Sequence, residues 1–246
     1  MPTIYLSPST QEGNYYVTGG SEETWMNRLA DAMEPYLTAS GIQYVRNLPS
    51  MTAASSIAAS NLGRYDLHLA LHSNAAPEGE YGSQRGILVF YYPTNADGRR
   101  AAILIADQLR EIYPLPGLVR AEASTTIGEV RLTRAPSVFL ELGYHDNRDD
   151  ATWIVHNLDP AARAIVKALC QYFSIPFLLP EPERTAVVDV ASGPLNIRYL
   201  PSRTAPIVAR AYDGDRLTVV NSWQGWDLVH FNGAVGYVDS QYLTYL

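Results

Sequence analysis

Residues 136–144 read Pro-Ser-Val-Phe-Leu-Glu-Leu-Gly-Tyr, and they indicate the fold of the N-terminal part of the chain most clearly. The stretch is almost continuously apolar, which is typical of a strand buried on both faces. Strands of this kind lie in largely parallel sheets that are covered by helices. The stretch therefore predicts an α/β fold, with one carboxylate, Glu141, inside an otherwise apolar strand.

Strand and helix spacings alternate through the residues around this stretch. Helical spacing is clear over residues 22–37, where Trp25, Leu29 and Met33 recur every three or four residues and Ser21 is a suitable N-cap. Further strands are predicted at 3–7, 42–47, 66–74 and 86–92, and further helices at 50–63, at 99–113, after Asn147 and from Asp159-Pro160. This alternation implies a mostly parallel, twisted sheet covered by helices.

Proline marks the end of the alternating pattern. Three prolines fall between residues 176 and 182, and each fixes φ and lacks a backbone donor, which favours an extended linker. We place the α/β domain at residues 1–177 and the linker at 178–186. Over residues 187–246, short β-rich runs are separated by Gly, Pro and Asn without a helical period, which predicts a small all-β barrel.

Composition narrows the classes of partner. The 246 residues carry a net charge of −7 with a pI near 5.2, which argues against nucleic-acid binding. The single cysteine, Cys170, excludes an internal disulfide, and its apolar neighbours indicate a buried thiol. No stretch supplies the ~18 apolar residues of a membrane helix, and the first residues lack the pattern of a signal peptide. We expect neither feature.

Functional groups in open α/β sheets gather at the carboxyl ends of the strands. Glu141 is notable because burying an unpaired carboxylate costs several kcal/mol. It is either paired with Arg131 or Arg134 in a salt bridge or functional. His72, near the end of the strand 66–74, is either a capped histidine or a site residue.

Two other candidate positions allow a structural interpretation. His68 lies four residues before His72, and four residues of a strand span ~13 Å, so we do not expect the two to share one ion. Glu22 and Glu23 open the first helix, where acidic residues complement the helix dipole. Neither glutamate is assigned a role from its position alone.

Taken together, these segments resemble the zinc-dependent N-acetylmuramoyl-L-alanine amidases of type 3. Residues 70–75, Ala-Leu-His-Ser-Asn-Ala, match the segment that holds the family's second histidine ligand, and residues 136–144 match the strand with its catalytic glutamate. Val130-Arg131 matches, less closely, a Val-Leu-Arg-like element that precedes this strand. The likeness covers most of residues 3–175, with the motifs in the family's order.

The resemblance implies a zinc enzyme that cleaves the amide bond between the lactyl group of N-acetylmuramic acid and L-alanine in peptidoglycan. It implies His72 and Glu22 as zinc ligands, with Glu23 as the fallback for Glu22. It also implies Glu141 as the general base, which passes a proton from water to the leaving amine. Zinc would lower the pKa of the water and polarise the carbonyl. Asn74 and Arg131 are the implied substrate contacts.

One ligand of the family pattern is absent. The family's first histidine falls near Thr10, where residues 7–11 read Ser-Pro-Ser-Thr-Gln. A catalytic zinc usually keeps three protein ligands, so the third would come from His145, or else from Gln11 or Glu12. Loss of the metal, which would leave a wall-binding protein, is the alternative.

The all-β region resembles bacterial SH3-like modules, which commonly bind cell-wall peptides. The resemblance rests on residues 193–198, 213–215, 225–226 and 236–238. It implies peptidoglycan as the partner, with Trp223 and Tyr242 in an aromatic groove, whereas we expect Trp226 and Tyr237 in the core.

Three functions remain in view. The first is a muramoyl-alanine amidase acting at the bacterial cell wall as an autolysin or endolysin. Since no signal peptide is seen, we expect it to reach the wall by lysis or another route. The second is a catalytically inactive wall-binding protein on the same scaffold, and the third is a metal-dependent hydrolase of another amide. Metal content separates the first two, and product identity separates the first from the third.

Overall fold

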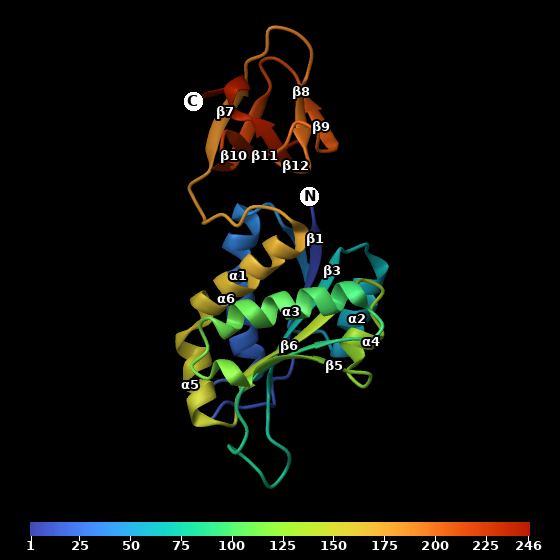
Figure 1. The fold of residues 1–246 in the computed structure, drawn as a ribbon, viewed down its shortest axis with the longest axis vertical. Coiled ribbons are helices and arrows are strands. Elements are labelled where there is room, and N and C mark those ends of the chain that lie inside the picture. The colour runs from blue at the N-terminus through green and yellow to red at the C-terminus, as the bar shows by residue number, and fades with distance from the viewer. The chain divides into compact units, whose positions relative to one another are not determined.

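In the computed structural model, which describes residues 1–246, strands and helices alternate first and a run of strands follows (Figure 1). Two compact units form: Pro2–Glu34 with Tyr44–Phe173, and Ser174–Leu246 with Met1 and Pro35–Gln43. The alternating elements are β1 (Thr3–Pro8), α1 (Glu22–Ala39), β2 (Gln43–Arg46), α2 (Ala53–Leu62), β3 (Leu67–Asn74), β4 (Ile87–Tyr91), α3 (Ala96–Arg110), η1 (Pro116–Leu118), β5 (Val119–Ala123), α4 (Gly128–Arg131), β6 (Ser137–Tyr144), α5 (Arg148–His156) and α6 (Leu158–Phe173).

The six strands form one sheet in the order β2-β1-β3-β6-β4-β5. β1 with β3, β3 with β6, and β4 with β5 pair in parallel, whereas β4 and β6 are antiparallel. The predicted mostly parallel sheet is thus confirmed. β6, the strand of residues 136–144, has a neighbour on both sides, and Val138, Leu140 and Leu142 are fully buried.

One face of this sheet carries the polar residues of interest. Ala70 of β3 and Phe139 of β6 pack with Val130 of α4. Because side chains alternate along a strand, His72 and Glu141, each two residues further on, extend from the same face. His72 and Glu141 are also register partners, so the two side chains lie beside each other near the carboxyl ends of their strands.

Capping explains where several helices begin. Ser21 Oγ accepts a hydrogen bond from Thr24 N before α1, as predicted, and Asn147 Oδ1 accepts from two backbone amides at the start of α5. α6 begins at Leu158, one residue before the start predicted at Asp159-Pro160, so Asp159 lies in its first turn. Cys170 is buried on α6, as expected. No helix combines the length and apolar character needed to cross a membrane.

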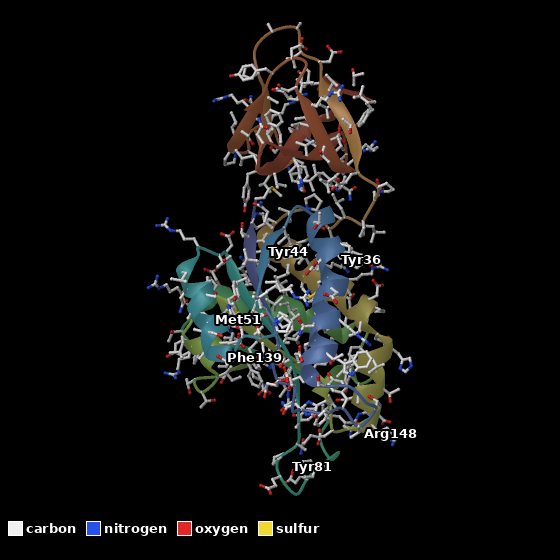
Figure 2. The ribbon with its side chains drawn as sticks, turned by 180° about the vertical axis from the view of Figure 1, so that it is seen from behind. Tyr36, Tyr44, Met51, Tyr81, Phe139 and Arg148 are labelled. Carbon is white, nitrogen blue, oxygen red and sulfur yellow. The ribbon has the colours of Figure 1, made fainter.

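The segment between β3 and β4 has no regular secondary structure and extends away from the sheet (Figure 1). It is fixed at its base, where Asp146 Oδ2 accepts from Gly82 N at 2.9 Å and Asn147 Nδ2 donates to Gly82 O at 2.7 Å. Tyr81 stands on this segment and is 72% exposed (Figure 2). A loop that follows β3 starts at the same end of the sheet as His72.

The second unit is a single antiparallel sheet with the strand order β13-β7-β10-β11-β12-β8-β9. Its elements are β7 (Arg184–Val188), β8 (Leu195–Arg198), β9 (Ile207–Ala211), β10 (Arg216–Trp223), β11 (Trp226–Phe231), β12 (Ala234–Asp239), η2 (Ser240–Tyr242) and β13 (Leu243–Tyr245). β7 begins at Arg184, inside the segment predicted as linker. The predicted all-β character of this region is confirmed.

Two tight hairpins set the register of the central strands. Asn232 and Gly233, between β11 and β12, both have positive φ, of 49° and 79°. Gln224 and Gly225, between β10 and β11, also both have positive φ. Two-residue turns of this kind match the twist of antiparallel strands. The strands bury an apolar core that consists of Ala186, Val188, Leu195, Ile197, Ala211, Leu217, Val219, Val229, Val238 and Leu243.

Candidate active site

Glu22 and His72, distant in sequence, meet at the end of β3. Glu22 is the first residue of α1 and is 1% exposed, and its Oε1 lies 2.7 Å from His72 Nδ1. Asn14 Nδ2 donates to Glu22 Oε2 at 2.6 Å, and Ser73 N donates to Oε1 at 3.4 Å. Burial would raise the pKa of Glu22, but the hydrogen bond and charge of His72, together with the hydrogen bonds from Asn14 and Ser9, outweigh it, and the pKa is lowered. Glu22 is therefore a fixed carboxylate aimed at His72.

The loop after β1 contributes Gln11 to the same place. Gln11 Nε2 lies 3.4 Å from His72 Nδ1, and Gln11 Oε1 accepts from Asn14 Nδ2 at 3.0 Å. A turn of the side-chain amide would present its oxygen to the histidine instead. No third His, Cys, Asp or Glu joins Glu22 and His72 in a group that could hold a metal. Besides Glu22, the side chain that faces His72 Nδ1 is thus that of Gln11.

Glu129, a residue that the sequence analysis missed, occupies the other side of His72. It lies on α4 and is 4% exposed, and its Oε2 is 3.3 Å from His72 Nε2. Its Oε1 accepts from Ser7 Oγ at 2.7 Å and lies 3.2 Å from His68 Nε2. His68 and His72 were not expected to share one ion, and the structure brings both rings to this one carboxylate instead. The sequence offered one signal for Glu129, which is the position of His68 inside an apolar strand. A buried histidine needs a polar partner, and here that partner is Glu129.

These contacts determine the charges of His72 and Glu129. Burial alone would lower the pKa of His72, but the hydrogen bonds to Glu129 and Glu22 raise it to about 10. Burial would likewise raise the pKa of Glu129, yet the hydrogen bonds from His68 and His72 lower it to about 2. Without a bound ion, His72 is thus a cation held between two carboxylates.

Glu141 has none of these partners. Although its side chain is not fully shielded from solvent, its Oε2 is buried and has no hydrogen bond. The salt bridge to Arg131 or Arg134 that we considered does not form, because Arg134 contacts Asn61 instead and Arg131 makes no ion pair. Burial raises the pKa of Glu141 to about 8, while the charge of His72 counteracts part of the effect.

His145 is not brought to the Glu22–His72 pair. Its Nδ1 lies 3.1 Å from Ser73 Oγ and 3.0 Å from Ser73 O, and its ring stacks on Tyr16. Adjacent strand residues point to opposite faces, so the side chain of Ser73 is directed away from the face of His72. The structure thus places His145 in contact with Ser73 rather than with the candidate ligands.

The two predicted substrate contacts lie on elements that also carry site residues, but neither lines the cavity beside His72. Asn74 ends β3, and its Oδ1 accepts from Ala75 N at 2.9 Å, which leaves its amide NH₂ group available. Arg131 ends α4 and is exposed. A cavity of about 410 Å³ opens beside His72 and Glu129, lined mainly by the loop after β1 and the start of α2.

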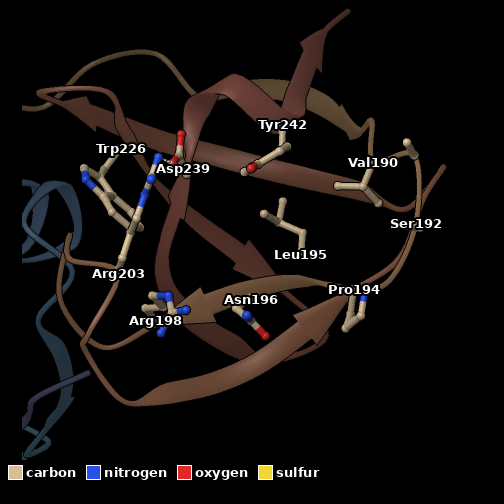
Figure 3. Close-up of a pocket in the computed structure, with 11 residues that line it drawn as sticks. Val190, Ser192, Pro194, Leu195, Asn196, Arg198, Arg203, Trp226, Asp239 and Tyr242 are labelled. Carbon is tan, nitrogen blue, oxygen red and sulfur yellow. Dashed lines mark hydrogen bonds and ion pairs between the residues drawn. The ribbon is translucent and has the colours of Figure 1, made fainter.

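The second unit has a pocket of its own, of about 490 Å³ (Figure 3). Trp226 and Tyr242 line it, together with Arg198, Arg203 and Asp239. Tyr242 is thus where a binding residue was expected. Trp226, expected in the core, packs against the core and also lines the pocket.

The remaining two aromatic residues of this unit differ. Tyr237 is fully buried, as predicted. Trp223 is partly buried and is not among the residues that line the pocket.

Comparison with known proteins identifies the family. Residues 8–171 match the N-acetylmuramoyl-L-alanine amidase family, which is more than half of the chain, and residues 193–244 match the bacterial SH3 domain. The chain belongs to the N-acetylmuramoyl-L-alanine amidase family, as the sequence resemblance implied, and carries a bacterial SH3 domain after it. Its enzyme class is therefore that of the amidases, which act on peptidoglycan in the cell wall. No curated protein matches the chain.

Solved structures share the fold of the first unit. AmiC2 of Nostoc punctiforme is 16% identical with a TM-score of 0.60, over 70% of this chain and 97% of that one. The catalytic domain of CwlV from Paenibacillus polymyxa is 16% identical with a TM-score of 0.62, over 72% and 100%. The catalytic domain of the CD27L endolysin, which targets Clostridium difficile, is 18% identical with a TM-score of 0.58, over 70% and 98%.

Proposed function

We propose that the first unit cleaves the amide bond between the lactyl group of N-acetylmuramic acid and L-alanine, with Glu141 as the general base. The observation that carries this proposal is a buried carboxylate oxygen without a hydrogen bond, placed in register beside His72 at the strand ends. Membership of the amidase family supports the substrate class.

A zinc ion fits the donor set beside Glu141. Glu22 and His72 supply an oxygen and a nitrogen of the kinds that zinc binds, and they converge from different elements. Gln11 would supply a third ligand atom if its side-chain amide turned, so that its oxygen replaced the nitrogen that now faces His72. When bound, zinc would polarise the scissile carbonyl and lower the pKa of a water molecule.

Glu141 would move the proton. Its ionised form accepts a proton from the attacking water at Oε2 and then delivers it to the departing amine of L-alanine. A pKa of about 8 suits both steps, because the group can exist in either form near neutral pH. Asn74 and Arg131 would hold the substrate, Asn74 through its free amide hydrogens and Arg131 by pairing with a carboxylate of the stem peptide.

The second unit would hold the protein on the wall. Its pocket combines an aromatic surface, Trp226 and Tyr242, with the guanidinium groups of Arg198 and Arg203 (Figure 3). Such a set suits a peptide that carries carboxylates. Trp223 remains a candidate for a contact outside the pocket.

Digestion of purified peptidoglycan tests the proposed reaction. The full chain is incubated with walls after metal removal, after added zinc, and with a chelator, and the products are read by mass spectrometry. We expect stem peptides that begin at L-alanine, released only when zinc is present. Cleavage elsewhere in the stem peptide would instead identify a hydrolase of another amide.

A catalytically inactive wall-binding protein is the second candidate. The observation that favours it is the absence of a third His, Cys, Asp or Glu on the Nδ1 side of His72, which leaves Gln11 to complete the site. This candidate predicts no cleavage under any condition while the protein still sediments with intact walls. The same digestion therefore separates the two.

A further inference from the structure

Glu129 has no part in the proposed hydrolysis, yet it contacts His72 directly. Its carboxylate has one oxygen for each histidine of β3: Oε2 lies 3.3 Å from His72 Nε2, and Oε1 lies 3.2 Å from His68 Nε2. It reaches this face of the sheet because α4 packs against β6. The two histidines and the glutamate come from elements that only the tertiary fold brings together.

The two ring nitrogens of His72 face different surroundings. Nδ1 faces Glu22 Oε1 and the amide of Gln11, whereas Nε2 faces Glu129 alone. A histidine binds a metal through the nitrogen that has no proton, and the partner of the other nitrogen determines which one that is. When a metal replaces one proton of the cationic His72, Glu129 keeps the proton on Nε2, and the lone pair that binds the metal lies on Nδ1.

The acceptor itself is held rigidly. Ser7 Oγ donates to Glu129 Oε1 at 2.7 Å, and His68, which is fully buried, is fixed in turn through Nδ1 to Ser60 Oγ at 2.9 Å. The ring of His72 stacks on Phe139 with centroids 4.2 Å apart, which restricts its rotation. The orientation of the His72 ring is therefore fixed by Glu129 at its edge and by Phe139 against its face.

We propose that Glu129 is a positioning residue for metal binding: it accepts the Nε2 proton of His72, so that Nδ1 is the ligand atom and points toward Glu22. The proposal rests on the zinc-dependent function argued above. His68 and Ser7 act through Glu129, because they fix the carboxylate in the orientation that His72 needs. In this proposal Glu129 acts through His72 and is not itself a ligand of the ion.

Zinc titration of the full chain against a chromophoric chelator tests the proposal. Relative to wild type, we expect the affinity to fall about 10-fold in Glu129→Gln, which keeps one acceptor oxygen, and about 100-fold in Glu129→Leu, which keeps none. The number of bound ions stays at one. Asp227→Asn is the matched control, since Asp227 is also fully buried and accepts two hydrogen bonds, but in the second unit. It should bind zinc as wild type does.

A second readout does not depend on affinity. Long-range ¹H–¹⁵N NMR spectra of the zinc-loaded wild type should show a proton on His72 Nε2 and none on Nδ1. Ligation through Nε2 would overturn the proposal. Wild-type zinc affinity in the Glu129→Gln variant would also overturn it. The Glu129→Gln variant alone is enough for this test if Glu129→Leu does not fold. Either result leaves the proposed zinc dependence standing. A wild-type chain that binds no zinc overturns both, and the peptidoglycan digestion then shows whether hydrolysis proceeds without it.

Discussion

Two regions flank His72, and each presents a carboxylate with a buried oxygen: α4 presents Glu129, and the end of β6 presents Glu141. Every oxygen of Glu129 has a hydrogen-bond partner, and its pKa falls to about 2. Glu141 Oε2 has none, and its pKa rises to about 8. The two groups are chemically identical, so the difference lies in the donors that surround them.

This contrast assigns the two carboxylates different tasks: Glu129 orients His72, and Glu141 would transfer the proton. A carboxylate that is fully hydrogen-bonded is held in its charged form and cannot readily accept a proton. A carboxylate buried without donors keeps a pKa near neutrality, as proton transfer requires. The cost of leaving Glu141 unpartnered falls on stability, which is a pattern found at functional sites.

The largest expected effect is on turnover. Glu141→Gln keeps the shape of the side chain but removes the base, so we expect the rate of peptidoglycan cleavage to fall by about 10²–10⁴-fold. Zinc affinity should remain close to that of wild type, in contrast to Glu129→Gln. The rates come from released stem peptides under matched zinc loading. Undiminished cleavage by Glu141→Gln would end the assignment of the base.

The next largest effect is on stability, with opposite pH dependence at the two sites. The folded-state pKa of Glu141 lies above its unfolded value, so the stability linked to its proton is complete below about pH 4.5 and is lost as pH rises through about 8. In metal-free protein at pH 9, Glu141→Gln should therefore be more stable than wild type by roughly 2–4 kcal/mol. Urea unfolding at pH 5 and pH 9 measures this.

Glu129 should behave in the reverse way. Its folded-state pKa is depressed, so its stabilisation is present above about pH 4.5 and is lost as pH falls toward about 2. Glu129→Gln should cost roughly 2–3 kcal/mol at pH 7 and progressively less in acid. If Glu141→Gln and Glu129→Gln changed the free energy of unfolding in the same direction at pH 9, the proposed difference between the two carboxylates would be wrong.

A smaller effect should come from completing the ligand set. Gln11→His places an imidazole beside Glu22 and His72, and imidazole is a better zinc ligand than an amide. Zinc should bind roughly 10-fold more tightly, or about 1.4 kcal/mol. The chelator competition measures the change. His145→Ala serves as the comparison, since His145 contacts Ser73 instead, and its zinc affinity should not change.

The smallest effect concerns the second unit. Tyr242 is 40% exposed in the pocket, so Tyr242→Ala should weaken sedimentation with intact walls by about 5-fold, or about 1 kcal/mol. Cleavage of soluble wall fragments should be unaffected. Trp223→Ala tests the region outside the pocket, and an equal loss there would shift the binding surface away from it.

Much of the fold could be predicted because the spacing of apolar residues along the sequence indicates which side chains of a strand or helix are buried. The apolar run of β6 and the helical spacing of α1 gave the α/β unit, and the short runs after residue 187 gave the all-β unit. The antiparallel direction of β4 was not foreseen. The available signal was the missing helix between β3 and β4, since parallel neighbours normally need a helical crossover.

The candidate site could be predicted only in part. Glu22 and His72, which the resemblance implied as ligands of one ion, do lie in contact, and their zinc binding stays a prediction. Glu129 could not be found, since the four-residue helix α4 is too short to show a periodicity. His68 was set aside on the ~13 Å that separates it from His72 along the strand. The long side chains of the two histidines nevertheless converge on one carboxylate, where each ring contacts a different oxygen.

The single thiol has a practical consequence for labelling. Cys170 is the only cysteine and is 1% exposed, and a thiol buried among apolar side chains is inert toward thiol reagents. A cysteine introduced in place of Tyr81, at the exposed part of the loop after β3, would therefore be the one that reacts quickly. A fluorophore attached there would report on this loop as wall fragments bind, in a chain that keeps its native cysteine.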